Sequence, residues 1–497
     1  MTGGDAPVRA YGGWRRSRSM GLLGLGPAAT LALLGSFAVL ILVAAVSLRA
    51  LMYVALPIVV GWSAGVVRVG GMPLAQVGLQ RLRWRHGTRA GYTSYRAEVV
   101  QRHTGVLTLP GALAATELLS AEDGCGGRYG LVRDRHTGYL TATLRVAPVS
   151  TWLADAEDAD RWVANWAAWL ASLGYLPALR WVTVTVDTAP DPGSTLTGQV
   201  AAAIDPSAPR AAVEIMDQLV ATAPAAAADV NTWVSITFDP GAFPAQPRDI
   251  AAAVTEAGQA LAGLKSALGA CGVTVLGRAR AVDIAGMVRI AFDPAVRGQI
   301  SRLLATKIGP GLEEYLNWAS AGPAEAEEHW DCYRHDSGTS VSWTWREAPR
   351  QSVTSDVLAR LLGPGAFPKR VSLQYRPLPA AAATAALDSE VRAAEFRHEC
   401  RRRTRRDVTA REVHDHARAR QAADEEAQGA GVSLLGLYVT VTVTDPAHLA
   451  RAVADTEAAA DVSKVRLQRL YRSQAAGFTS TLPCGICLPE LVRRWHH

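Results

Sequence analysis

A long apolar stretch near the N-terminus constrains this chain more than any other feature. Residues Pro27 to Val67 contain a single charged side chain, Arg49, in a protein of 497 residues that carries 51 basic and 45 acidic ones. One helix over this stretch would be ~60 Å long, about twice the thickness of the hydrocarbon core of a bilayer. Two helices of about 18 residues joined by a tight turn fit that thickness. The sequence therefore predicts a transmembrane helical hairpin within residues 20–69.

The basic residues around this stretch predict its orientation. Arg49 belongs at the turn, because a lone guanidinium is most stable in water beyond the bilayer. Cytoplasmic flanks of membrane helices carry an excess of Lys and Arg. The residues expected to determine topology are Arg15, Arg16, Arg18, Arg49, Arg68, Arg81, Arg83 and Arg85. We therefore expect a multi-pass protein of the cell membrane with both termini in the cytoplasm.

A cleaved signal peptide and a buried soluble hairpin are the alternatives to a membrane hairpin. The apolar core of a signal peptide is 7–15 residues long and is not followed by a second span. The pair Arg15 and Arg16 suggests a twin-arginine signal, but no compact apolar core and cleavage site follow it. A soluble hairpin without a polar face needs a large core around it. The membrane hairpin is therefore favoured.

Charge and cysteine content exclude two broad classes. The first 100 residues carry eleven Arg and two acidic residues, whereas the other 397 carry 40 basic and 43 acidic ones. Because basic residues beside a span set topology and attract anionic lipid, the basic balance does not indicate nucleic-acid binding, and no direct nucleic-acid partner is expected. Six cysteines are too few and too scattered for a disulfide framework.

The pattern after the apolar stretch predicts α+β structure. Alternation of apolar residues and threonine predicts a strand over residues 181–186, and three tryptophans at helical spacing predict a core-facing helix over residues 158–173. The predicted organisation is a basic cytoplasmic tail (1–19), the transmembrane hairpin (20–69), a basic interfacial linker (70–103), a first cytoplasmic α+β lobe (104–310) and a second such lobe (311–497) with one long charged helix at about 380–428.

One supersecondary unit occurs twice. In each copy a strand ends in Asp-Pro and is followed by an amphipathic helix and a second strand. The first copy comprises Val234–Phe238, Asp239-Pro240, Ile250–Leu268 and Val273–Leu276; the second comprises Leu437–Val443, Asp445-Pro446, His448–Ala460 and Val465–Leu470. The repetition predicts two related lobes, each with a helix on one face of a sheet.

Motifs for chemistry are sparse. A G-x-x-x-x-G-K-[ST] sequence is absent, so the chain is not a P-loop ATPase. Cys484 and Cys487 form a C-x-x-C pair, but a structural zinc site needs four ligands. His329, Cys332 and His335 also have metal-ligating side chains, but in an extended segment they alternate between faces. We expect no catalytic residue, no cofactor and no metal.

Several stretches resemble one protein family. They are Leu109-Pro110-Gly111-Ala112-Leu113-Ala114-Ala115 with Arg128-Tyr129-Gly130, Trp169-Leu170 before Ser172-Leu173-Gly174, Val186-Asp187-Thr188-Ala189-Pro190-Asp191, Tyr333-Arg334-His335-Asp336-Ser337 before Trp343, and Ser473-Gln474-Ala475-Ala476-Gly477-Phe478 before Leu482-Pro483. Together they resemble an actinobacterial family of integral membrane proteins from conjugative, type IV secretion-like gene clusters. The architecture is also similar, more loosely, to a PrgI-like two-helix subunit joined to the non-ATPase N-terminal portion of a conjugation ATPase.

This resemblance implies a non-enzymatic structural component on which a separate ATPase docks. The partners it implies are the lipid bilayer, a cognate secretion or conjugation ATPase, other membrane subunits and further copies of the chain. The family supplies no catalytic residues. An EccE-like subunit of a type VII secretion membrane complex is the alternative, and a membrane-tethered enzyme is a third. Co-purified partners would separate the first two, and an enzyme would require convergent ionisable groups in a pocket.

Overall fold

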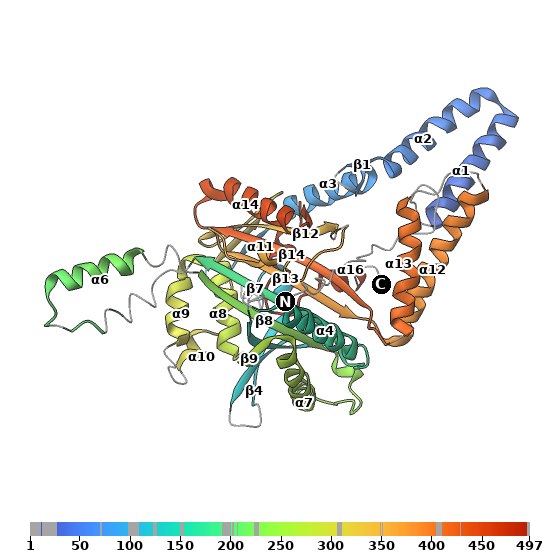
Figure 1. Ribbon diagram of the computed structural model, residues 1–497. Helices are drawn as coiled ribbons and strands as arrows, with labels where there is room; N and C mark the ends of the chain where they lie inside the picture. The colour runs from blue at the N-terminus through green and yellow to red at the C-terminus, as the bar shows by residue number, and fades with distance from the viewer. Residues whose placement is uncertain are drawn as a thin grey trace, which may run out of the picture. The chain divides into compact units, whose positions relative to one another are not determined.

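The computed structural model describes most of the chain, which divides into two compact units (Figure 1). The described residues are 11, 27–69, 72–97, 109–122, 127–149, 154–190, 200, 203–205, 207–222, 228–305, 311–347, 349, 351–403, 410–427 and 429–494. The larger unit comprises residues 1–14, 94–380 and 430–497, and the smaller one comprises residues 15–93 and 381–429.

The smaller unit is almost entirely helical. Its elements are α1 (Pro27–Val46), α2 (Leu48–Val66), a two-stranded ribbon of β1 (Arg68–Val69) and β2 (Met72–Pro73), α3 (Leu74–Arg89), α12 (Ala380–Arg403) and α13 (Ala410–Ala427). The indole Nε1 of Trp62 on α2 donates a hydrogen bond to Ser36 Oγ on α1 at 2.9 Å. The predicted pair of helices is therefore present.

The assignment of this pair to a bilayer is contradicted. Across the residues that the structure describes, no helix has both the length and the hydropathy needed to cross a membrane. A spanning helix must cover about 30 Å of hydrocarbon. The predicted transmembrane hairpin at 20–69, the integral-membrane class and the multi-pass location with cytoplasmic termini are accordingly withdrawn.

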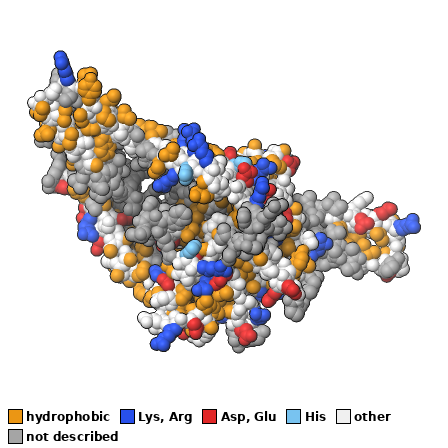
Figure 2. Space-filling model, turned by 180° about the vertical axis from the view of Figure 1, so that it is seen from behind, with side chains coloured by type: hydrophobic (Ala, Val, Ile, Leu, Met, Phe, Trp, Pro, Cys, Tyr) orange, Lys and Arg blue, Asp and Glu red, His pale blue; other side chains and the backbone are white. Residues whose placement is uncertain are grey.

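Large apolar side chains nevertheless lie on the outside of α1 and α2. Leu42, Val46, Met52 and Tyr53 are between 70% and 84% exposed. Figure 2 shows hydrophobic side chains gathered over this pair of helices. The apolar stretch therefore forms helices, and these large apolar side chains on its outer face are exposed.

The charged segment that predicts one long helix forms two helices instead. Thr384 Oγ1 on α12 donates to Glu426 on α13 at 2.9 Å, and Arg420 on α13 pairs with Glu395 on α12 at 3.4 Å, so the two helices run antiparallel. Small side chains, among them Ala383 and Ala419, are buried on these helices. Because small side chains allow helices to approach closely, packing favours a hairpin over one straight helix.

The larger unit is built on one antiparallel sheet. Thirteen described strands form it, in the order β3-β10-β11-β12-β14-β13-β7-β8-β6-β5-β4, with β15 also on β12 and β9 also on β6. The strands are β3 (Ser94–Arg96), β4 (Thr116–Glu122), β5 (Arg128–Asp134), β6 (Leu140–Pro148), β7 (Leu179–Pro190), β8 (Ala228–Phe238), β9 (Val273–Arg278), β10 (Glu325–Glu328), β11 (Tyr333–His335), β12 (Gly338–Glu347), β13 (Lys369–Pro377), β14 (Ser433–Val443) and β15 (Arg466–Arg469). The α+β class is therefore confirmed.

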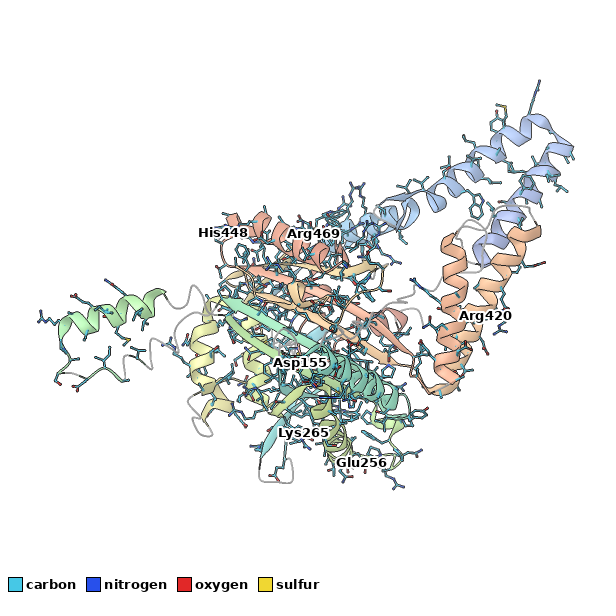
Figure 3. The ribbon with its side chains drawn as sticks, in the orientation of Figure 1. Asp155, Glu256, Lys265, Arg420, His448 and Arg469 are labelled. Carbon is cyan, nitrogen blue, oxygen red and sulfur yellow. The ribbon has the colours of Figure 1, made fainter. Side chains whose placement is uncertain are left out.

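Helices and short 3-10 turns connect these strands. The helices are α4 (Ala156–Leu173), α6 (Arg210–Thr222), α7 (Ile250–Leu268), α8 (Ala281–Phe292), α9 (Arg297–Ala305), α10 (Gly311–Tyr315), α11 (Ala359–Leu362), α14 (Leu449–Val462), α15 (Gln474–Ser480) and α16 (Leu488–Arg494). The 3-10 turns are η2 (Gly111–Leu113), η4 (Pro240–Ala242), η5 (Gly269–Cys271), η6 (Pro294–Val296) and η7 (Pro446–His448). Figure 3 marks Glu256 and Lys265 along α7.

The sheet consists of two halves with the same topology. In the first half the order is β4-β5-β6-β8-β7 with β9 on β6; in the second it is β10-β11-β12-β14-β13 with β15 on β12. The halves meet at β7 and β13, which pair antiparallel with Val184 opposite Leu373. The internal repeat is thus confirmed and extended, but the two predicted lobes share one sheet because their central strands hydrogen-bond directly.

The repeated Asp-Pro turns have the same local geometry in both halves. Asp239 accepts a hydrogen bond from Gly241 N at 3.0 Å, and Asp445 accepts one from Ala447 N at 2.9 Å. In each case proline follows in the first position of a 3-10 turn, where its missing N–H costs nothing. The motif therefore ends β8 and β14 in the same way.

One face of the sheet carries two apolar cores. Leu144, Val182 and Ile236 in the first half are buried in a core that extends to α4 and α7. Val341, Trp343 and Val439 in the second half are buried in a separate core that includes Leu361 of α11 and Ala452 of α14. Because side chains alternate along a strand, the residues between these positions lie on the opposite face.

Candidate binding site

The opposite face of the sheet is lined with hydroxyl groups that pair across neighbouring strands. In the first half Thr141 Oγ1 lies 2.9 Å from Thr237 Oγ1, and Thr143 Oγ1 lies 2.9 Å from Ser235 Oγ. The second half has the same pairs at equivalent positions: Ser340 with Thr442 at 2.8 Å and Ser342 with Thr440 at 2.9 Å. These side chains are all buried, so each pair satisfies groups that water cannot reach.

The C-terminal segment covers this polar face in the first half. Three of its backbone carbonyls accept hydrogen bonds from the sheet: Pro483 from Thr143 Oγ1 at 3.1 Å, Gly485 from Trp181 Nε1 at 3.1 Å, and Ile486 from Gln374 Nε2 at 2.8 Å. A buried carbonyl needs such a donor. The segment is therefore held by specific side chains of β6, β7 and β13.

Gly485 is required at the closest approach of this segment to the sheet. Its φ is +70°, in the left-handed region, and a Cβ there would lie 2.1 Å from Thr141 Oγ1. Both the backbone conformation and the available space thus exclude a side chain. The glycine of the C-G-I-C sequence is explained by packing.

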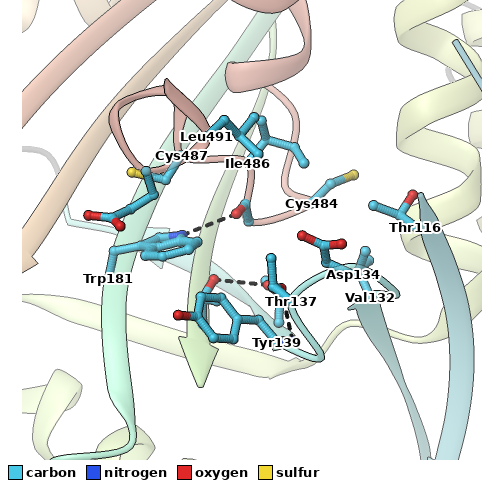
Figure 4. A pocket seen from close by; sticks show the side chains of 14 residues that line it. Thr116, Val132, Asp134, Thr137, Tyr139, Trp181, Cys484, Ile486, Cys487 and Leu491 are labelled. Atoms are coloured by element: carbon cyan, nitrogen blue, oxygen red, sulfur yellow. Dashed lines mark hydrogen bonds between the residues drawn. The ribbon is translucent and has the colours of Figure 1, made fainter. Parts of the chain in front are cut away.

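A hollow remains between the C-terminal segment and the hairpin of β5 and β6 (Figure 4). Its volume is about 420 Å³, counting space that is open to solvent. It is lined by Thr116, Val132, Asp134, Thr137, Tyr139, Thr141, Trp181, Thr237, Cys484, Gly485, Ile486, Cys487, Glu490 and Leu491. Figure 4 shows the Asp134 carboxylate directed into it below Cys484.

The two thiols of the C-x-x-C pair line this hollow without facing each other. Cys484 and Cys487 are both buried and both unoxidised. Figure 4 shows their sulfur atoms on opposite sides of the loop. Burial raises the pKa of the Cys484 thiol far above its ordinary value, which keeps that thiol protonated and a poor nucleophile. The arrangement supports neither a disulfide switch nor a paired metal ligand.

A buried cluster of charges lies at the centre of the sheet. Arg297 of α9 donates to Asp187 of β7 at 2.8 Å and to Asp229 of β8 at 3.0 Å. Asp187 is directly opposite Arg370 of β13 in the strand register. Burial lowers the pKa of Arg370 to about 10, and its guanidinium carbon lies 4.8 Å from the ring centroid of Phe478. These charges connect α9 and α15 to the two halves of the sheet.

His335 is buried on the same face of the sheet. Its Nδ1 lies 2.6 Å from the carbonyl oxygen of Phe292, and its Nε2 lies 2.8 Å from Ser340 Oγ. Burial lowers its pKa to about 4, so the imidazole is neutral at physiological pH. The side chain therefore serves as a packed, hydrogen-bonded core residue.

The other members of the His329, Cys332 and His335 group do not converge on His335. His329 lies 3.3 Å from Glu327, and Cys332 is only partly buried. Within the described ranges, no three His, Cys, Asp or Glu side chains are placed to hold a metal ion. Only His335 lies on a strand, β11; His329 and Cys332 lie in the turn between β10 and β11, where His329 N donates to the Cys332 carbonyl at 2.9 Å. The turn, and not strand alternation, therefore separates these side chains.

The residues predicted to determine topology do not form a site. Arg15, Arg16 and Arg18 lie outside the described residues, as does the side chain of Arg68. Arg49 is exposed at the start of α2. Arg81, Arg83 and Arg85 are exposed along α3. Because their predicted role depended on a membrane span, it is withdrawn with that span.

Residues 61–65 have the spacing G-x-S-x-G, which marks the nucleophilic serine of many hydrolases. Here Ser63 lies inside α2, and its carbonyl oxygen accepts a helical hydrogen bond from Val67 N at 2.9 Å. A nucleophile elbow requires a sharp turn between a strand and a helix. The spacing therefore does not mark a catalytic serine in this chain.

Asp134 is a lining residue that no sequence motif indicated. The hollow beside Asp134 exists only because the C-terminal segment folds over this part of the sheet. The residues around Asp134 in the sequence therefore do not predict a site. Comparison with known proteins adds no further assignment: no protein family model matches the chain, and no curated protein sequence matches it.

Proposed function

We propose that this protein is a non-enzymatic structural subunit of a conjugation or type IV secretion-like apparatus, on which a separate ATPase docks. The observation that carries the proposal is the single sheet of two equivalent halves, each interrupted by a helical insertion at the same point of its topology. The insertion between β7 and β8 contains α6, and the insertion between β13 and β14 contains α12 and α13. The sequence resemblance to subunits of such systems supports the same assignment.

The insertions have the character of binding surfaces. Ile215 and Met216 on α6 are 60% and 42% exposed, and Phe396 on α12 is 54% exposed. Exposed aliphatic and aromatic side chains on segments that leave a rigid scaffold are typical of partner contacts. A sheet with such insertions suits a platform that positions other proteins.

The buried ionisable groups support a structural role. Arg297 pairs with Asp187 and Asp229, and the His335 imidazole is bonded at both nitrogens. Charged groups used for catalysis face a site that substrate can enter. Here the buried ones face one another and hold elements of the fold in place.

Co-purification and a hydrolysis assay test the proposal together. Affinity-tagged protein expressed with the ATPase of its own gene cluster is expected to retain that ATPase, and the purified protein alone is expected to hydrolyse neither ATP nor GTP. The variants Ile215→Asp and Phe396→Asp identify the insertion that docks. Tyr175→Asp, at a residue 70% exposed outside both insertions, is the control. Nucleotide turnover at enzyme-like rates by the protein alone, or no retained ATPase, would refute the proposal.

A further inference from the structure

We propose that the hollow beside Asp134 binds a small cationic hydrogen-bond donor, an ammonium or guanidinium group. The inference is independent of the role proposed above, because it rests on the lining of the hollow and on a comparison between the two halves of the sheet.

The internal repeat places Asp134 and His335 at equivalent positions. Val132 pairs with Thr141 across β5 and β6, and Tyr333 pairs with Ser340 across β11 and β12. Asp134 comes two residues after Val132, and its backbone N donates to Tyr139 O at 3.0 Å. His335 comes two residues after Tyr333 and pairs with Gly338. Both side chains lie next to an equivalent hydroxyl pair on the polar face of the sheet.

The second half fills the space above its hydroxyl pair with an imidazole. His335 bonds to Ser340 Oγ at 2.8 Å and packs 4.8 Å, centroid to centroid, from the ring of Phe478. In the first half Asp134 stands at this position, and the hydroxyl pair of Thr141 and Thr237 adjoins Gly485 and the hollow. The two halves therefore differ in the side chain beside the hydroxyl pair: an imidazole in the second half, and a carboxylate that borders the hollow in the first.

The lining of the hollow selects a cation. It includes two carboxylates, Asp134 and Glu490, and two aromatic rings, Tyr139 and Trp181, and none of its 14 residues is Lys, Arg or His. Carboxylates and aromatic faces together attract ammonium and guanidinium groups.

Asp134 provides the free charge. Glu490 is paired with Arg376. Asp134 Oδ1 accepts a bond from the backbone N of His136 at 2.8 Å, and no described Lys or Arg forms an ion pair with Asp134. Since a carboxylate binds a charged donor more strongly than it binds water, the second carboxylate oxygen of Asp134 is the point of attachment.

The size of the hollow limits the ligand to a head group. The space of about 420 Å³ is partly open to solvent. The enclosed space that a water-sized group can reach is only about 30 Å³, so the hollow admits a head group and cannot enclose a nucleotide. The cation has two sources of the same chemistry: a free small amine, or a Lys or Arg side chain of a partner polypeptide.

Calorimetric titration of the full chain tests the site. The probes are butylamine, N-acetylarginine amide and a Gly-Arg-Gly tripeptide blocked at both ends. Binding is expected to weaken at least tenfold in Asp134→Asn, which keeps the size of the side chain. Binding is expected to stay unchanged in Glu122→Gln, which removes the carboxylate of an exposed residue at the end of β4. Equal binding by Asp134→Asn, or no binding of any probe at millimolar concentration, would overturn the proposal.

A second variant uses the internal repeat itself. Asp134→His introduces the ring that occupies the equivalent space in the second half, so it is expected to abolish binding while the unfolding midpoint stays within a few degrees of the parent. Retained binding in this variant would contradict the site. Tighter binding of the blocked tripeptide than of butylamine identifies a partner polypeptide as the source, and the reverse order identifies a free amine.

Discussion

Arg297 Nη2 lies 2.8 Å from Asp187 Oδ2, and both side chains are almost completely buried, with exposed fractions of 7% and 1%. The pair connects α9 to the central strand β7, while a second bond from Arg297 reaches Asp229 on β8. It therefore joins the helix layer to β7, the strand of the first half that pairs with the second half, and to its neighbour β8.

The first prediction concerns this ion pair. Arg297→Met should lower the free energy of unfolding by about 3 kcal/mol, because it leaves two carboxylates near the core without their cation. Chemical denaturation measures the change. Arg302 is exposed on the same helix. Arg302→Met should therefore change the free energy of unfolding by less than about 0.5 kcal/mol. Equal effects of the two variants would show that the pair contributes nothing specific.

The second prediction concerns pH and His335. Its pKa is about 4 in the folded protein and about 6.5 in the unfolded chain, so the unfolded chain takes up the proton first as pH falls. The neutral imidazole therefore contributes its full share to the free energy of unfolding above about pH 6.5, and this contribution is lost progressively toward pH 4. Between pH 7 and pH 5 the loss from this residue should be about 2 kcal/mol.

Two histidine variants isolate that contribution. His335→Gln should lack this part of the pH dependence, so its deficit relative to the parent shrinks between pH 7 and pH 5. His136→Gln, at an exposed position of the equivalent hairpin, should keep the parental slope. Urea titrations at several pH values measure both. A parental slope in His335→Gln would mean that the imidazole does not titrate across folding.

The third prediction concerns closure of the C-terminal segment. In Gly485→Ala the new Cβ meets Thr141, in addition to the strain of a positive φ. The substitution should destabilise the protein by more than about 2 kcal/mol. Gly138→Ala separates the two causes, since Gly138 has a φ of +73° with no atom near its Cβ position. That variant should cost about 1 kcal/mol.

Thiol labelling reports where this destabilisation acts. In Gly485→Ala, maleimide should modify Cys484 and Cys487, which are 3% and 5% exposed in the parent. Peptide mass spectrometry identifies the modified residues. If both thiols stay protected while stability falls, the segment does not open and the glycine acts through the whole fold.

The fourth prediction is a gain of stability. Lys369 is 7% exposed on β13, and burial, together with the nearby charge of Arg360, lowers its pKa to about 8. Because this value lies below the unfolded value of about 10.5, burial of the charged form costs free energy at pH 7, and that cost falls as pH rises from about 8 toward about 10.5.

Replacing the cation removes this cost. Lys369→Met should raise the free energy of unfolding by about 2 kcal/mol at pH 7, and the gain should shrink by pH 10. Lys265→Met, at an exposed position on α7, is the control and should be neutral at both pH values. A loss of stability in Lys369→Met would show that the ammonium makes favourable contacts with the fold.

Local pattern was a reliable guide where neighbouring residues decide the structure. The alternation after Trp181 predicts a strand, and β7 extends over it; the Asp-Pro turns at Asp239 and Asp445 predict a repeat, and η4 and η7 have matching caps. Alternation cannot indicate what covers each face. Thr183 and Thr185 are more deeply buried than Val184 between them, because helices and the C-terminal segment cover the polar face too.

Patterns whose outcome depends on distant partners do not predict the structure correctly. The apolar stretch after Pro27 predicts two helices correctly, but hydropathy alone did not establish a bilayer span. The charged segment from Ala380 to Gln428 predicts one helix, whereas small buried side chains such as Ala419 permit two that pack together. In both cases the environment of the helix decided the outcome, and the segment itself does not encode that environment.

The sequence by itself determined which segments become helices and strands, where each Asp-Pro turn ends a strand, and that one unit is repeated, because these follow from steric preferences within a few residues. Only the tertiary structure decided that the two repeats share one sheet and that Asp134 and His335 stand in equivalent places with different surroundings. The physical reason is that hydrogen bonding between strands and the burial of side chains join residues that lie hundreds of positions apart, such as Trp181 and Gly485.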